Sequence, residues 1–340
     1  MNIKNSNYYL GVDGGGTKTA AVIADREGNV LGDGLDGPVN LAWVDRKTAR
    51  NCLKRAVEKA FKNSGISPQD ISCAYLGMAG VKGKNINEKR KPIFTDELHS
   101  LGVFSNRIIV DNDAFLGLVS TISLKEGIVV VAGTGFNAKG INSKGERIHL
   151  PYYVAERGAG HIIGRLAAKE SLFSLLGVSE TTLLAEKIMN ILDFNEIDQL
   201  VEWLSTSRAS YELGQLTPAV TQAAEAGDFL AQKLLNTAGK ELGLAAVIIA
   251  RKAGFKKCRV GIVGGVFKAG EYILEPMKDV LTACNIEAKL VPPFMPPAGG
   301  AIILAWKEDG HNPGRVEIDK LSCEVSAALS SFWKTNQTGG

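Results

Sequence analysis

The stretch YLGVDGGGTKTAAVIADREGNVLG, from Tyr9 to Gly32, contains the pattern that decides the fold. An apolar run ends at Asp13, three glycines follow, and a second apolar run, TAAVIAD, begins at Thr19. The turn-forming residues DREGN then separate this run from VLG. Because turn residues between short apolar runs are typical of hairpins, the stretch predicts a strand, a glycine loop, a second strand, a turn and a third strand.

Two well-known phosphate-binding loops do not match this glycine cluster. A P-loop requires a final glycine where this chain has Thr17, and a dinucleotide fingerprint requires a third glycine where it has Thr19. The dinucleotide fingerprint also opens a helix, whereas a strand is predicted here. A glycine loop between antiparallel strands resembles the phosphate loop of the actin, Hsp70 and sugar-kinase superfold, in which Asp13 would hold Mg²⁺ through water. An ordinary glycine-rich hairpin is the alternative for this stretch alone.

Two further glycine sites follow along the chain. GIVVVAGTGFNAKGINSKGE (Gly127–Glu146) repeats the design, with Gly133-Thr134-Gly135 between two predicted strands. In RVGIVGGVFKAGEYILEPM (Arg259–Met277), a predicted buried strand ends at Gly264-Gly265 and a helix follows, which suits a site for adenine and ribose. Each site alone could be a tight turn. The repeated unit predicts two related lobes with a nucleotide between them.

The composition argues against several classes of protein. A chain of 340 residues with 45% hydrophobic residues is large enough for two domains. Its 39 basic and 36 acidic residues are too balanced for a nucleic-acid-binding protein. Five scattered cysteines predict reduced thiols, and no apolar run approaches the roughly 18 residues of a membrane span. We expect a cytoplasmic protein that binds neither nucleic acid nor membranes. We expect a solvated loop and helix face from the basic cluster Lys82, Lys84, Lys89, Arg90 and Lys91.

The chain resembles the BadF/BadG/BcrA/BcrD ATPase family, and within it the N-acetylglucosamine kinase-like proteins, over nearly its full length. The resemblance rests on GVDGGGTKTAAVIAD, GPVNL, LGMAGV, VDNDAFLGL, AGTGFNAKG, GAGHIIG, VGGVFKAGE and PPAGGAIILA. It implies an α/β protein with two actin-like ATPase (ribonuclease H-like) lobes and a nucleotide cleft between them. The implied activity is transfer of the γ-phosphate of ATP, with Mg²⁺, to a hydroxyl of an amino sugar, N-acetylglucosamine or glucosamine. We also expect a homodimer.

The expected domain organisation follows the glycine sites. The first lobe spans residues 1–118, with a helix near 298–310 as a candidate to complete it. The second lobe spans 119–312 and contains a helical insertion, 160–252, whose segments carry apolar residues at helical spacing. The remaining tail, 313–340, is weakly patterned, and we expect its end to be frayed. Asp45 and Asp228 are predicted to cap two long helices.

The resemblance also assigns roles to particular residues. Asp113, in VDNDAF, would take the proton from the acceptor hydroxyl, with a simple helix cap as the structural alternative and Asp111 as a neighbour that could face metal or phosphate. Asn40 in GPVNL aligns with an asparagine that contacts the sugar. The expected nucleotide-binding residues are Gly14, Gly15, Gly16, Thr17, Lys18, Gly133, Thr134, Gly135, Gly264 and Gly265.

Departures from the family pattern bear on the acceptor. Amino-sugar kinases of the family usually carry a tryptophan and an acidic pair where this chain has Ala159, Arg165 and Leu166. An arginine in place of an aspartate suits a carboxylate, so a 2-keto-3-deoxy sugar acid such as 2-keto-3-deoxygluconate is the alternative substrate. An Arg165 side chain that points outward on its helix is the structural alternative. We expect His161 to be a packing residue.

Two other function classes have specific requirements. An acyl-CoA reductase activator of this family requires closely spaced cysteines near its phosphate loops, where this chain has Val131 and Ala132. A non-catalytic ATP-binding regulator would lack the base or the metal ligand, and both Asp13 and Asp113 are present. The sequence therefore favours an enzyme.

Overall fold

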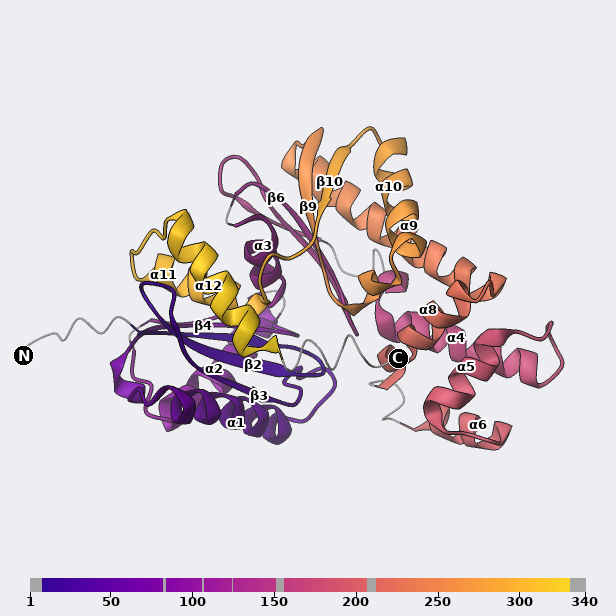
Figure 1. Cartoon of the computed structure of the whole chain (residues 1–340), viewed down its shortest axis with the longest axis horizontal. Coiled ribbons are helices and arrows are strands. Elements are labelled where there is room, and N and C mark those ends of the chain that lie inside the picture. Colours follow the sequence, from indigo (N-terminus) through magenta and orange to yellow (C-terminus); the bar gives the residue numbers. More distant parts are fainter. Residues whose placement is uncertain are drawn as a thin grey trace, which may run out of the picture. The chain divides into compact units, whose positions relative to one another are not determined.

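The computed structural model describes residues 8–81, 84–105, 107–123, 125–150, 156–206 and 212–330, with only the backbone for 84–88. The chain forms two compact units (Figure 1). The first unit consists of Met1–Leu124 and Pro293–Gly340, and the second is Lys125–Pro292. The chain therefore leaves the first unit once and returns to complete it.

The first unit contains a five-stranded mixed sheet in the order β3-β2-β1-β4-β5. Strands β1, β2 and β3 are antiparallel neighbours, whereas β4 runs parallel to β1 and β5 parallel to β4. This confirms the predicted strand, glycine loop and strand. The strands are β1 (Tyr8–Gly14), β2 (Thr19–Asp25), β3 (Val30–Asp36), β4 (Ile71–Met78) and β5 (Ile108–Asp111).

Helices cover both faces of this sheet, which explains why its strands are almost continuously apolar. On one face, α1 (Arg46–Ser64) and α2 (Lys84–Ser100) pack against side chains such as Leu10 and Val12. The other face carries α3 (Ala114–Ile122), α11 (Pro297–Glu308) and α12 (Arg315–Ala328) (Figure 1). These helices pack against Tyr9, Val22 and Tyr75. Residues from both ends of the chain thus share one core.

Local signals explain where α1 begins and ends. The Asp45 side chain accepts a hydrogen bond from the backbone N–H of Thr48 at 2.9 Å, as predicted, and Gly65 ends the helix with φ of 67°. Pro92 lies inside helix α2. The buried Glu97 of α2 pairs with Arg50 of α1 at 2.5 Å. This ion pair joins the two helices.

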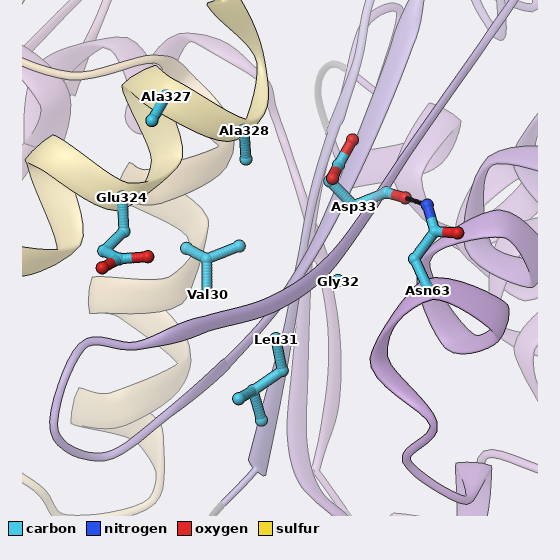
Figure 2. Close-up of a pocket in the computed structure, with 8 residues that line it drawn as sticks. All are labelled: Val30, Leu31, Gly32, Asp33, Asn63, Glu324, Ala327 and Ala328. Carbon is cyan, nitrogen blue, oxygen red and sulfur yellow. Dashed lines mark hydrogen bonds between the residues drawn. The ribbon is translucent and has the colours of Figure 1, made fainter.

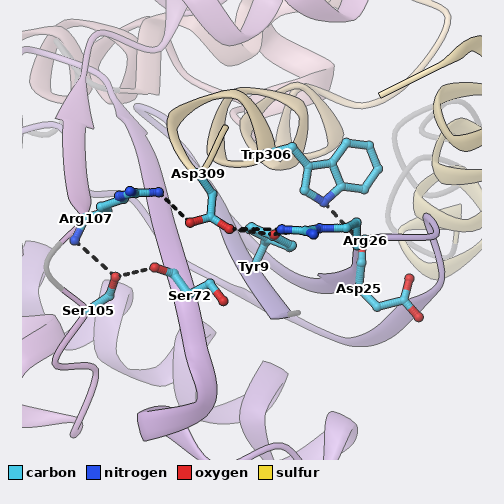
Figure 3. A network of polar contacts seen from close by, with 8 residues as sticks. All are labelled: Tyr9, Asp25, Arg26, Ser72, Ser105, Arg107, Trp306 and Asp309. Carbon is cyan, nitrogen blue, oxygen red and sulfur yellow. Dashed lines mark hydrogen bonds and ion pairs between the residues drawn. The ribbon is translucent and has the colours of Figure 1, made fainter. Parts of the chain in front are cut away.

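A polar network fixes the end of α11 to the sheet (Figure 3). The Tyr9 hydroxyl donates to the Asp309 carboxylate at 2.8 Å, and Arg26 and Arg107 both pair with that carboxylate. Burial raises the pKa of Tyr9 to about 12, so its hydroxyl stays protonated and remains a donor. The indole N–H of Trp306 donates to the carbonyl of Asp25 at 3.2 Å.

The second unit repeats the plan of the first sheet. Its order is β10-β9-β6-β7-β8, so β6 takes the place of β1, with β7 and β8 antiparallel on one side and β9 and β10 parallel on the other. This confirms the predicted α/β class with two related lobes. The strands are β6 (Gly127–Ala132), β7 (Phe136–Ile141), β8 (Arg147–His149), β9 (Lys257–Val263) and β10 (Glu287–Val291).

Helices fill most of the second unit between β8 and β9. The longest, α9, packs on the sheet, and its cap Asp228 accepts from the N–H of Ala231 at 2.9 Å, as predicted. The same carboxylate accepts from the N–H of Leu184 at 3.2 Å, which ties α5 to α9. Of the helices described, α4 (Gly160–Leu175), α5 (Leu183–Leu192), α6 (Ile197–Ser205), α8 (Thr217–Glu225) and α9 (Phe229–Ala253) precede β9, and α10 (Glu271–Ala283) follows it.

The bounds of the two units differ from the sequence-based division both where the chain enters the second unit and where it returns to the first. Residues 119–124, which the sequence placed in the second lobe, belong to the first unit. The helix offered near 298–310 as a candidate to complete the first lobe is α11, and it does pack on the sheet of the first unit. Part of the weakly patterned tail forms α12, whose Leu321 and Val325 are buried. The end expected to be frayed lies outside the described residues. In the part of the chain that the structure describes, no helix has both the length and the apolar composition needed to cross a bilayer.

Candidate active site

The first glycine loop joins β1 to β2. The N–H of Gly15 donates to the carbonyl of Lys18 at 2.7 Å and closes the loop. Gly14 is required for space, since a β-carbon there would lie 2.7 Å from the sulfur of Met78 and from a methyl group of Val39. None of the three loop glycines has a positive φ, so close packing, not left-handed backbone, explains them.

The loop is fixed on both sides by neighbouring segments. The carbonyl of Gly14 accepts from the N–H of Ala79 at 2.7 Å, and that of Gly15 accepts from the N–H of Val39 at 3.1 Å. A β-carbon on Gly16 would overlap the indole ring of Trp43. Thr17 is exposed at the tip of the loop. The loop is therefore held in one shape before any ligand binds.

Asp13 lies at the carboxyl end of β1. In the sheet register it is level with Gly77 of β4, and Gly77 is level with Asp111 of β5. The pKa of Asp13 is raised to about 7, mainly by burial and secondly by the negative charge of Asp113, while the positive charge of Lys18 acts to lower it. Asp13, Asp113 and Lys18 are therefore close enough to interact electrostatically.

This pair of carboxylates suits a divalent cation. Oxygen donors are the ligands that Mg²⁺ prefers, and a cation would relieve the repulsion that raises the pKa of Asp13. Among the described residues, no group of three or more His, Cys, Asp or Glu side chains converges on one point. Water and phosphate oxygens would therefore have to complete the coordination of a Mg²⁺ ion held by Asp13.

The junction of β5 and α3 positions Asp113. Asp111 accepts from the hydroxyl of Tyr75 at 2.8 Å and from the N–H of Asn112 at 2.7 Å, so it is engaged at the end of the sheet. The amide of Asn112 accepts from the N–H of Ala114 at 3.2 Å. Asp113 already has helical φ and ψ, and its side chain makes no capping hydrogen bond. At the start of α3, it is therefore the side chain of Asn112 that hydrogen-bonds to the helix backbone. A capping role does not explain Asp113.

Asn40 lies beside this junction in the same unit. It is 7% exposed, and its side-chain oxygen accepts from the N–H of Ala42 at 3.0 Å. Gly80, with φ of 81°, leaves room for this oxygen, which a β-carbon there would overlap. The carbonyl of the next residue, Val81, accepts from the side chain of Asn112 at 3.1 Å. Asn40 is therefore linked through the turn after β4 to the residue that precedes Asp113.

The second glycine loop lies in the second unit, between β6 and β7. The N–H of Gly133 donates to the carbonyl of Gly135 at 3.0 Å. The start of α4 packs on this loop, because Gly160 donates to the carbonyl of Gly133 at 2.8 Å and His161 donates to that of Thr134 at 3.0 Å. The ring Nδ1 of His161 lies 2.7 Å from the same Thr134 oxygen. The backbone and the ring of His161 thus both meet the second glycine loop.

The third glycine site meets the second. Gly264 has φ of 117°, and a β-carbon on it would overlap the carbonyl of Ala132 and lie 2.9 Å from the nitrogen of Gly133. A β-carbon on Gly265 would meet nothing within 4 Å. Packing therefore requires Gly264 but leaves open space at Gly265. The structure thus brings the second and third glycine sites together, and both stay predicted nucleotide sites.

Arg165 lies on α4, one turn after His161, and its side chain is exposed. No hydrogen bond or ion pair of Arg165 is found within the described parts of the chain. Ala159, just before α4, is buried, so a larger side chain would not fit there without movement. The exposure of Arg165 agrees with a side chain that points outward from α4, which was the alternative to a role in binding the substrate.

Sequence reasoning missed two side chains of this region. The ring of Trp43 contacts the first glycine loop, and the backbone N–H of Trp43 donates to the carbonyl of Asn40 at 2.9 Å. Arg90 donates from Nη1 to the carbonyl of Gly80 at 2.5 Å, although its basic cluster was expected to be a solvated face. Trp43 follows Asn40 by three residues, the spacing of a turn, and this could have indicated its position. No local pattern distinguishes Arg90 from its neighbouring lysines. Of that cluster, Lys82 and the side chain of Lys84 lie outside the described residues.

A pocket of about 510 Å³ elsewhere in the first unit contains none of these residues (Figure 2). It lies between β3 and α12, and its carboxylates are Asp33 and Glu324. Burial raises the pKa of Asp33. The pocket is therefore separate from the candidate active site.

Comparisons with known proteins agree with this arrangement. A family model described as the BadF/BadG/BcrA/BcrD ATPase family matches residues 10–305. An N-acetylmuramic acid/N-acetylglucosamine kinase of Clostridium acetobutylicum is 29% identical over 307 residues, which are 88% of this chain and 99% of the relative. A glucosamine kinase of Vibrio cholerae, GspK, is 26% identical over 310 residues, 90% of this chain and 98% of the relative.

A solved structure shares the fold. It is a protein from Chromobacterium violaceum whose assignment as an N-acetylglucosamine kinase is provisional. Its TM-score is 0.69 at 22% identity, and the match covers 88% of this chain and 99% of that one. The two-lobed fold predicted from the glycine sites is therefore confirmed.

Proposed function

Because this chain belongs to the BadF/BadG/BcrA/BcrD ATPase family, we propose that it is an ATP-dependent sugar kinase whose acceptor is an amino sugar. Two relatives that match nearly the whole chain are kinases of N-acetylmuramic acid, N-acetylglucosamine or glucosamine. The observation that carries the proposal is the interaction of Asp13 and Asp113 at one end of the first sheet, beside Lys18 and the first glycine loop. Carboxylates and a lysine beside a glycine loop suit phosphoryl transfer.

Each of these groups has a distinct role in the proposal. Asp113 accepts the proton of the attacking hydroxyl, an effect typically worth about 10²–10⁴ in rate. Asp13 holds Mg²⁺ through water, and Lys18 and the N–H groups of the first loop bind phosphate oxygens. Bound Mg²⁺ supplies the positive charge that neutralises the transferred phosphate. The glycines at 133, 135, 264 and 265 bind the rest of the nucleotide.

Asn40 orients the acceptor. Its side-chain oxygen already accepts one backbone hydrogen bond, so its NH₂ group remains to donate to a sugar hydroxyl. The sugar-acid alternative was based on Arg165, whose side chain is exposed. The amino sugar therefore stands first, and N-acetylglucosamine, glucosamine and N-acetylmuramic acid, the acceptors named for the two relatives, are the candidates.

An ADP-release assay with Mg-ATP tests this proposal. We expect turnover with at least one of N-acetylglucosamine, glucosamine and N-acetylmuramic acid, and slow ATP hydrolysis without an acceptor. Glucose and 2-keto-3-deoxygluconate serve as comparison acceptors. The Asp113→Asn variant gives the background rate of ADP release. The proposal fails if the wild-type protein exceeds this rate with none of the sugars and calorimetry detects no binding of Mg-ATP.

A further inference from the structure

The turn after β4 brings a second polar side chain to Asn40. Gly80 has no β-carbon, and the space that one would fill is bounded by the side-chain oxygen of Asn40 and by Nη1 of Arg90, the latter at 2.9 Å. A guanidinium group therefore lies beside the amide that we assign to the acceptor. The positive φ of Gly80 makes this arrangement specific to glycine.

This guanidinium is also connected to the reacting groups of the first unit. Ala79, just before Gly80, donates its N–H to the first glycine loop at 2.7 Å. Val81, just after it, accepts from Asn112, the neighbour of Asp113. The turn that Arg90 contacts thus lies between the phosphate loop and the proposed base.

Arg90 retains most of its capacity to bind a ligand. One of its five N–H donors is used on the carbonyl of Gly80. Arg50, Arg55 and Arg107 all pair with carboxylates of this unit. Within the described side chains, which exclude 84–88, no carboxylate pairs with Arg90. A half-buried arginine of this kind suits an anion brought by a ligand.

We propose that Arg90 binds a carboxylate on the acceptor, so that the preferred substrates are amino sugars that carry a carboxylate. The inference rests on the proposed kinase activity and names the substrate class of the same site. A planar guanidinium can bind a carboxylate through two parallel hydrogen bonds while Asn40 holds the sugar ring. The same charge disfavours a cationic sugar.

Three amino sugars that share one ring provide the test. N-acetylmuramic acid carries a carboxylate, N-acetylglucosamine is neutral, and glucosamine is cationic when its amine is protonated. For the wild-type protein we expect kcat/KM to fall in that order. In Arg90→Gln we expect a loss on the order of 10²-fold for the carboxylated sugar, mainly in KM, and about threefold or less for the neutral one. The order among the three should then largely disappear.

Control variants separate this role from others. Arg165→Gln removes an exposed arginine and should leave the charge preference unchanged. Arg90→Lys keeps the charge but not the two parallel hydrogen bonds, so it should retain a reduced preference. It also provides a second variant if Arg90→Gln does not fold. Thermal melts check that each variant is folded.

Calorimetric titration of the same sugars gives a readout that does not need turnover. An equal loss of affinity for all three sugars in Arg90→Gln would show that Arg90 only holds the Gly80 turn and would overturn the inference. A selective loss in Arg165→Gln would overturn it as well. If wild-type protein phosphorylates neutral sugars and Arg90→Gln behaves identically, the kinase proposal stands and this inference fails. If no sugar binds or reacts, the kinase proposal itself fails.

Discussion

The carbonyl oxygen of Leu116 in α3 lies 2.7 Å from the point where a β-carbon on Gly300 of α11 would stand. On its other side, the Leu116 side chain fills the space above Gly77 of β4, where a β-carbon would overlap it. The N–H of Leu116 donates to the carbonyl of Asp113 at 3.0 Å. Two glycines far apart in the sequence therefore set the position of the proposed base.

Replacing Gly300 should disturb catalysis as well as stability. In Gly300→Ala the new methyl group meets backbone, which cannot rotate away, so α3 and α11 must separate. We expect a loss of about 1–3 kcal/mol in the free energy of unfolding. Because Asp113 moves with α3, kcat should fall more than KM rises. Urea denaturation and steady-state kinetics measure the two effects.

Gly299→Ala is the matched control for this variant. Its added methyl group would lie 2.7 Å from the sulfur of Met295, the end of a flexible side chain that can move. Its kcat should stay near the wild-type value. If the two variants behave alike, the contact between Leu116 and Gly300 does not position Asp113.

Asp113→Asn should retain binding of Mg-ATP and lose about 10²–10⁴ of kcat, because an amide cannot accept the hydroxyl proton. Calorimetry and ADP release measure the two properties. Asp111→Asn is the comparison. The Asp111 side chain accepts a hydrogen bond from the Tyr75 hydroxyl, and the side-chain oxygen of an asparagine can still accept it. A nearly normal Asp113→Asn together with an inactive Asp111→Asn would transfer the role of base to Asp111.

Asp13→Asn should stabilise the ligand-free protein at alkaline pH. The pKa of Asp13 is about 7 in the folded protein, compared with about 3.9 for an unfolded aspartate. The folded state therefore binds the extra proton between these values, and the contribution of this group to stability falls as the pH rises from about 4 to about 7. An asparagine does not ionise, so the variant should be more stable than wild type at pH ~8 and similar to it only at pH ~4 or below, where the unfolded aspartate is also protonated.

Urea denaturation without nucleotide or Mg²⁺ measures this difference across the pH range. Asp113→Asn removes only the neighbouring charge and leaves the burial of Asp13, which is the larger cause of its raised pKa. The gain in stability of Asp113→Asn over wild type at pH ~8 should therefore be smaller than that of Asp13→Asn. Equal stability of Asp13→Asn and wild type at pH ~8 would contradict the raised pKa. A gain in stability with a loss of activity would mark Asp13 as a residue kept for function.

Trp43 should report on ligand binding, because its ring contacts Gly16 and its backbone contacts Asn40. We expect Mg-ATP or the acceptor to change tryptophan fluorescence in the wild-type protein and not in Trp43→Phe. Trp306→Phe is the control, since Trp306 is fully buried on the far side of the sheet from α1. Trp43→Ala should raise KM about tenfold through the loss of loop support, a cost near 1.4 kcal/mol. Signal retained in Trp43→Phe would contradict this assignment.

The sequence predicted those features that depend on neighbouring residues. Helix α1 begins directly after its predicted cap, Asp45, because a capping signal is local in the sequence. The glycine loops were predictable because strand, loop and strand follow one another directly. The predicted roles of Asp13 and Asp113 depended on a resemblance, and their proximity became visible only in the folded sheet.

Other features depend on contacts that no local pattern records. The orientation of Arg90 is set by Gly80, which belongs to a different element. Helix α12 has weak periodicity, and its burial depends on two side chains, Leu321 and Val325, that meet the core of the first unit. The close approach of Leu116 and Gly300 joins residues far apart in the chain, so single-sequence reasoning had no means to find it.

The order in which the chain is made has a consequence for its synthesis. The apolar sheet face that carries Tyr9, Val22 and Tyr75 is covered largely by α11, and the ribosome must produce the entire second unit before it reaches that helix. A nascent chain therefore presents this face uncovered throughout that interval, as a surface for chaperones or for aggregation. We expect residues 1–124 to aggregate when produced alone, and residues 293–340 to rescue them when supplied as a separate polypeptide.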